Sequence, residues 1–282
     1  MPADQGRPVP APPPPRTGRR AGRLLVSFAV GLMIAGSIAF VVLPILTLFL
    51  ELPLDALPEV FSDPVVIDAL LLSLATATAS TAIVLVIMTP IAYVTARHAF
   101  PGRELVETLM DLPIVLPPAV AGLGLLLAFG RFGLAGQYLN LLGITVAFTP
   151  IAVVMAQVFV ASPFYLRQAR TSFAELDPAY EAAARTLGAT GLYTFLHVTV
   201  PLTLEGLVSG TIMTFARALG EFGATILFAG NLQGRTQTMP LAIYSTMQSD
   251  LRASCALAIV LVVISFGVIA AVRVLGRRGR VA

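Results

Sequence analysis

The chain has 282 residues, of which 57% are hydrophobic and only 12% are charged, and its mean hydropathy is +0.87. This apolar content exceeds that of a soluble domain and indicates a protein that folds in a membrane. The net charge of +3 comes without any lysine, and a P-loop ATPase needs a lysine on the nucleotide phosphates. If ATP powers this chain, another chain must hydrolyse it. The single cysteine, Cys255, excludes an internal disulfide and a cysteine-based metal site.

The N-terminal segment predicts a tail followed by a membrane helix. Residues 1–23 are rich in proline and arginine and cannot bury a core, so a disordered cytoplasmic tail is expected. The apolar run 24–50 is too long for the hydrophobic part of a signal peptide and has no convincing cleavage site. A retained first transmembrane helix over residues 24–50 is therefore predicted.

Five further apolar runs are long enough to span a bilayer as helices, because about 20 helical residues cross the hydrocarbon and satisfy their own backbone. They cover approximately residues 69–94, 109–129, 144–165, 204–229 and 254–272. The expected fold class is therefore an all-α membrane protein with six transmembrane helices. A basic cytoplasmic C-terminus, residues 276–282, follows the last helix.

The distribution of arginine predicts the orientation. Of the 18 basic residues, 14 lie in the tail, the 96–108 loop, the 166–203 loop and the C-terminus, and three lie in the opposite loops. The positive-inside rule then places both termini and the 166–203 loop in the cytoplasm. The first external loop, residues 51–68, is acidic and contains no basic residue.

The second run contains small, weakly polar residues among alanines: Ser73, Thr76, Thr78, Ser80 and Thr81. Such residues let neighbouring transmembrane helices approach closely. This pattern predicts helix packing and no chemistry.

The third run is interrupted by prolines. Pro113, Pro117 and Pro118 stand close before Gly122, so regular helical hydrogen bonding must break there. Such breaks are tolerated at membrane depth where protein or a cavity receives the freed backbone groups. Pro117, Pro118 and Gly122 are therefore expected near a transport pathway, as part of its gate. A kinked structural helix is the alternative.

The 166–203 loop contains a short helix with clear start and stop signals. Asp177 is a suitable N-cap, Pro178 suits the first helical position, Glu181 lies in the first turn, and Gly188 fits the C-terminal stop. Its alanine-rich faces pack closely against another surface but bury too little area for a core. The pattern predicts a docking helix, and an ordinary connector between membrane helices is the alternative.

The fifth run carries an ionisable pair, Arg217 and Glu221, which are four residues apart and are expected to share one face of a helix. Charges at this depth are costly and usually face protein or a water-filled path. In one interpretation the two charges neutralise each other or a partner helix. In the other, Arg217 attracts a passing anion while Glu221 prevents tight binding.

These stretches together resemble a known family. Glu181-Ala182-Ala183, followed by Gly188 and Pro201, resembles the EAA loop of ABC importer permeases, although the usual family glutamate would stand at Ala182. Residues 111–124 are similar to permeases for the tetrahedral oxyanions molybdate and sulfate. Residues 215–245, with Gly234-Arg235-Thr236-Gln237-Thr238, are similar to the molybdate permeases in particular. The resemblance covers about residues 65–275.

The resemblance implies a type I ABC importer permease fold in the bacterial inner membrane. Two permease copies would form one pore for molybdate or tungstate, which a periplasmic binding protein would deliver, and no nucleic acid would be involved. Cytoplasmic ATPase subunits would dock on the coupling helix, at Glu181, Ala182, Ala183, Gly188 and Pro201. Pro117, Pro118, Gly122, Arg217, Glu221 and Gly223 would form the pathway and gate. This chain would bind no cofactor or metal and catalyse no reaction, since ATP and magnesium would lie on the ATPase.

Three alternatives stay open at this stage. A sulfate or thiosulfate permease would have the same architecture. A secondary transporter would need a coupling-ion site, yet the chain has few intramembrane carboxylates and no evident inverted repeat. A membrane enzyme would need a nucleophile with its base or a metal site, and the sequence displays neither pattern.

Overall fold

The computed structural model describes residues 17–50 and 62–278, and the chain divides into two units, residues 1–51 and 52–282. The first unit contains helix α1 (Thr17–Leu50). This helix begins within the segment that was expected to be a disordered tail and ends at residue 50 as expected. Residues 1–16 of that tail lie outside the described residues, as do most of the acidic 51–68 loop and residues 279–282.

Every regular element described in the second unit is a helix. The order is α3 (Pro64–Arg97), α4 (Arg103–Val115), α5 (Pro118–Phe129), α6 (Gly136–Leu141), α7 (Pro150–Glu175), α8 (Pro178–Thr186), α9 (Gly191–Thr194), the π-helix η1 (Phe195–Thr199), α10 (Val200–Leu219), α11 (Gly223–Phe228), α12 (Met239–Met247) and α13 (Leu251–Arg278). Over both units, five helical segments of the described chain are long and apolar enough to cross a membrane, and α4 with α5 makes a sixth. The prediction of an all-α, multi-pass membrane protein is confirmed.

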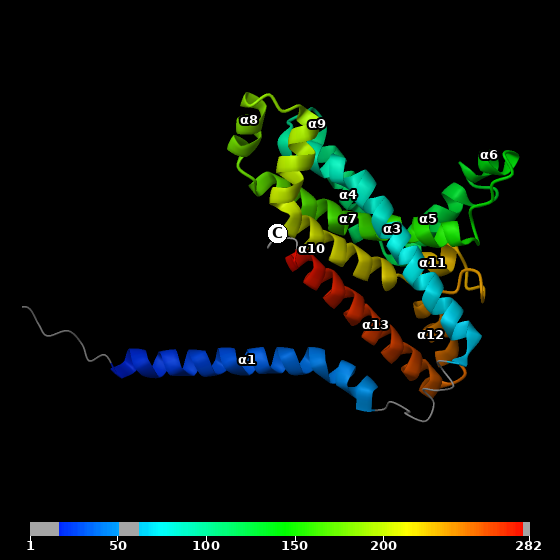
Figure 1. Ribbon diagram of the computed structural model, residues 1–282. Helices are drawn as coiled ribbons and strands as arrows, with labels where there is room; N and C mark the ends of the chain where they lie inside the picture. The colour runs from blue at the N-terminus through cyan, green and yellow to red at the C-terminus, as the bar shows by residue number, and fades with distance from the viewer. Residues whose placement is uncertain (1–16, 51–61, 279–282) are drawn as a thin grey trace, which may run out of the picture. The chain divides into compact units, whose positions relative to one another are not determined.

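Helices α3, α7 and α10 pack along one another and form the centre of the second unit (Figure 1). Their shared core contains Val84, Ala92, Tyr165, Leu166, Ala169, Phe173 and Leu207. With 34 residues, α3 rises about 50 Å, which exceeds the roughly 30 Å of hydrocarbon in a bilayer. Part of α3 therefore extends beyond the hydrocarbon.

The small polar residues of α3 do more than allow close packing. Ser80 Oγ donates to Gln157 Oε1 on α7 at 2.9 Å, and Gln157 Nε2 donates to Thr76 Oγ1 at 3.2 Å. Ser73 Oγ accepts the backbone N–H of Met239 at 2.7 Å, at the start of α12. The expectation of packing alone was incomplete, because these side chains also link three helices through buried hydrogen bonds.

Three predicted spans have different boundaries in the structure. The third is bent by 113° between α4 and α5, at the prolines that predicted a break. The fourth, α7, begins at Pro150 and continues to Glu175, so residues 166–175 of the expected loop are helical. The fifth was expected to run from 204 to 229, but α10 ends at Leu219 and α11 begins at Gly223. The structure therefore has one broken span, α4 with α5, and the predicted fifth span is interrupted after Leu219, although residues 191–219 alone are long enough to cross a membrane.

Candidate functional site

The predicted docking helix is α8, and its ends form as the sequence indicated. The Asp177 carboxylate accepts the backbone N–H of Ala179 at 2.9 Å, which caps the first turn. Gly188 has a φ of +86°, and the N–H of Ala189 donates to the carbonyl of Ala184 at 3.1 Å. Together these form the glycine stop that closes a helix C-terminus. We call residues 176–199, which include α8, α9 and η1, the coupling segment.

The Glu181 side chain points into the protein and is only 10% exposed. Its Oε1 accepts the Thr199 hydroxyl at 2.8 Å and lies 3.7 Å from Nε of Arg97. Arg97 also donates through Nη2 to the carbonyl of Leu176 at 2.7 Å. Glu181 therefore fastens α8 to η1 and to the end of α3, whereas its predicted contact with an ATPase stays a prediction.

The exposed surface of α8 includes two small apolar residues. Ala182 and Ala183 are exposed there, together with Tyr180, and Leu187 just after the helix is 89% exposed. Figure 1 shows α8 and α9 together at one end of the second unit. The alanines of α8 are therefore accessible, and the close packing against another subunit that their pattern predicted stays a prediction.

Pro201 lies in the first turn of α10, directly after the π-helix. A proline has no N–H to donate to the carbonyl four residues earlier, and the adjacent Val200 N–H donates instead to Phe195, five residues earlier. The wider turn brings the Phe195 ring to 4.9 Å from the ring of Tyr93 on α3, between centroids. In this structure Pro201 therefore shapes the helix that carries the coupling segment.

The bend between α4 and α5 lies beside the interruption between α10 and α11, and we call this place the break junction and define it as residues 116–122 and 220–224. Here α5 packs directly on α11. A Cβ on Gly122 would lie 2.6 Å from the carbonyl oxygen of Ala224, and one on Gly223 would lie 2.7 Å from Cβ of Pro118. Only glycine permits this approach. The predicted gate residues Pro118, Gly122 and Gly223 are thus brought together, with Pro117 as the N-cap of α5.

Arg217 and Glu221 form an ion pair at this junction. Arg217 Nη1 lies 2.7 Å from Glu221 Oε2, and the Glu221 side chain is 1% exposed while that of Arg217 is 26% exposed. Glu221 Oε1 also accepts the N–H of Ala224 at 2.8 Å. The expectation that both residues share a face of one helix was wrong, because α10 ends at Leu219.

The pair instead joins the end of α10 to the first turn of α11. This geometry favours mutual neutralisation, and a direct role of Arg217 in attracting an anion stays a prediction. Within the described parts of the chain, no group of three or more histidine, cysteine, aspartate or glutamate side chains could hold a metal ion. The charged residues of the break junction fasten the end of α10 to the first turn of α11.

Comparisons with known proteins agree with this geometry. The model of the family described as "Binding-protein-dependent transport system inner membrane component" matches residues 88–281. The chain is 43% identical to the molybdenum transport system permease protein ModB of Mycobacterium tuberculosis, over 82% of this chain and 88% of that protein. It is 42% identical to the sulfate transport system permease protein CysT of Salmonella typhimurium, over 62% of this chain and 63% of that protein.

A solved structure shares the fold. It is the crystal structure of a bacterial ABC transporter that imports the acidic polysaccharide alginate, and the TM-score is 0.76 at 16% identity. The match covers 94% of this chain and 99% of the other. The importer permease fold that the family resemblance implied is confirmed.

Proposed function

Because the chain belongs to the family of binding-protein-dependent transport system inner membrane components, we propose that it is the permease subunit of an ATP-driven importer of molybdate. The observation that carries the proposal is the similarity to the molybdenum permease along most of both chains. Tungstate, a tetrahedral dianion like molybdate, is expected to use the same pathway. The arginine distribution supports cytoplasmic termini in a bacterial inner membrane.

ATP would be hydrolysed by a separate cytoplasmic subunit that docks on α8. The exposed Ala182 and Ala183 can approach a groove closely, and the neighbouring Leu187 offers apolar area. Arg97 and Glu181 hold the helix from inside, so a force on its outer face is passed to α3 and α10. ATP and magnesium would remain on that subunit.

The pathway would lie between two copies of this chain, with the break junction at its gate. Pro117 and Pro118 are exposed on the surface of the single chain, as expected if a second copy faces them. Because Gly122 and Gly223 have no side chain, α5 and α11 approach more closely than a Cβ would allow, and the gate would be built on this contact. A periplasmic binding protein would deliver the anion to the opposite end of the pair.

Sulfate is the second candidate cargo, and the similarity to the sulfate permease favours it. The test is uptake of labelled molybdate by proteoliposomes that contain the permease, its ATPase and its binding protein. We expect tungstate to compete more strongly than sulfate. Stronger competition by sulfate would instead support a sulfate importer.

A further inference from the structure

Helix α4 is weakly embedded for an element that leads into the break junction. None of its 13 residues is buried, and Leu105, Leu109 and Val115 are exposed along its outer side. It continues through Leu116 and Pro117 into α5 after the 113° bend. A helix with so little buried area needs another interaction to fix its position, and its inner side packs on α7.

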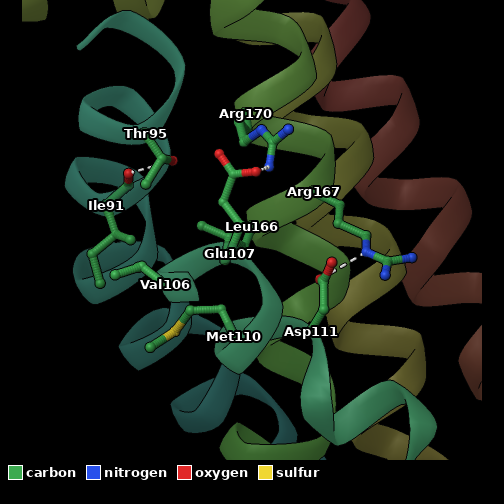
Figure 2. Close-up of a pocket in the computed structure, with 9 residues that line it drawn as sticks. All are labelled: Ile91, Thr95, Val106, Glu107, Met110, Asp111, Leu166, Arg167 and Arg170. Atoms are coloured by element: carbon green, nitrogen blue, oxygen red, sulfur yellow. Dashed lines mark hydrogen bonds and ion pairs between the residues drawn. The ribbon is translucent and has the colours of Figure 1, made fainter. Parts of the chain in front are cut away.

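That interaction is a ladder of ion pairs, which we call the α4–α7 ladder and which comprises Arg103, Glu107, Asp111, Arg167 and Arg170. Glu107 binds two arginines: Oε1 lies 2.8 Å from Nε of Arg103, and Oε2 lies 2.6 Å from Nη1 of Arg170 on α7. One turn further along α4, Asp111 Oδ1 lies 2.8 Å from Nε of Arg167. Figure 2 shows both contacts between α4 and α7, above the apolar side chains of Val106 and Met110.

The order of charges favours the observed register, because it forms both pairs between α4 and α7. The two helices pair in antiparallel order, so a one-turn shift in one direction would bring Glu107 to Arg167 and place Arg103 opposite Arg170. Two arginines would then repel each other. A shift in the other direction would pair Asp111 with Arg170 but would bring the apolar Val115 opposite Arg167 and leave that arginine without its carboxylate. The ladder thus holds α4 at one position along α7.

The position matters because the two helices lead to different ends of the transport machinery. Helix α7 ends at Glu175, immediately before the coupling segment, whereas α4 leads into the break junction. The ladder side chains are between 21% and 57% exposed, so they are not a buried cluster on which folding depends. Ion pairs that are not needed for folding can still make α4 move together with α7.

We propose that the α4–α7 ladder is a positioning latch that makes α4 and α5 move with α7, so that displacement of the coupling segment reaches the break junction. This inference rests on the proposed function, since it needs an ATPase to displace that segment. Glu107 is its central residue, because it joins the α4 arginine to the α7 arginine.

The test reverses the charge of Glu107 in the complete assembly, with ATP hydrolysis and molybdate uptake measured together. In E107R, hydrolysis stimulated by the binding protein should continue, while molybdate imported per ATP falls on the order of tenfold. The matched control is E104R, the same change at an exposed residue of α4 outside the ladder. Inverting the whole triad, R103E/E107R/R170E, should restore the ratio of import to hydrolysis.

A distance measurement keeps the test independent of transport. In a C255A background, spin labels on Leu109 of α4 and Thr171 of α7, both exposed, should give one narrow distance with and without nucleotide. E107R should broaden the distribution of distances, and the inverted triad should narrow it again. If E107R does not assemble, the variant E107Q/D111N takes its place. The latch would be overturned if E107R imported as much molybdate per ATP as E104R and had the same distance distribution between residues 109 and 171. Failure of the unaltered protein to import molybdate would instead overturn the proposed function, and the distance would still decide on the latch.

Discussion

Replacing Arg217 by glutamine should destabilise the break junction more than replacing its partner Glu221 by glutamine. R217Q leaves an almost fully buried carboxylate without its cation, and breaking one side of such a pair costs about 3–5 kcal/mol. We expect the lower end, about 3 kcal/mol, because Glu221 keeps the N–H of Ala224. E221Q keeps an acceptor for that N–H and leaves Arg217 partly exposed to solvent, so its cost should be about 1 kcal/mol.

Thermal unfolding of the purified variants measures the difference. At about 2–4 °C per kcal/mol, R217Q should lower the midpoint by about 6–12 °C and E221Q by only a few degrees. R217Q/E221Q should be more stable than R217Q, because it removes the unpaired charge. If R217Q and E221Q lowered the unfolding midpoint equally, and the double variant lowered it by the sum of the two, the ion pair would not be what fastens α11. If the double variant recovers stability but not molybdate uptake, the charge of Arg217 acts on the cargo.

Three further predictions concern the docking surface and the junction. A183D should insert in the membrane but lose its ATPase in co-purification, since an unpaired carboxylate would enter a close apolar contact; undiminished association with normal uptake would contradict the docking role of α8. G122A should impair uptake because its methyl group would meet Ala224, whereas the control G124A has open space at its Cβ; equal uptake by both would argue against tight packing of α5 on α11. Cysteines at 117–123 in a C255A background should react with water-soluble thiol reagents to a degree that depends on nucleotide, and uniform inertness would place the gate elsewhere.

The sequence allowed prediction of those features that depend on neighbouring residues. The ends of α8 follow from Asp177 and Gly188, whose effects act within one turn. The bend between α4 and α5 follows from prolines that lack an N–H. The apolar runs predicted a multi-pass helical protein, because any membrane helix must satisfy its backbone internally.

The features that the sequence did not reveal depend on contacts between distant segments. The inward turn of Glu181 requires Arg97 and Thr199, and no spacing rule connects those positions. The interruption after α10 is stabilised by the Glu221 contact with Ala224 and by the packing of α5 on α11. The sequence does not reveal these contacts, and the apolar run 204–229 therefore looks like one continuous helix. Gly220 and Gly223 on either side of Glu221 were the one local sign that this run could break.

The energy source of uptake tests most directly whether this chain is the permease of an ATP-driven importer. The permease and its ATPase would be reconstituted in proteoliposomes. Labelled molybdate and the binding protein would be supplied on one side of the membrane, and Mg-ATP on the other side, where α8 and the ATPase lie. We predict uptake that requires ATP hydrolysis and persists when ionophores collapse the proton and sodium gradients. Uptake that follows an ion gradient and proceeds without ATP would contradict the proposed function and indicate a secondary transporter.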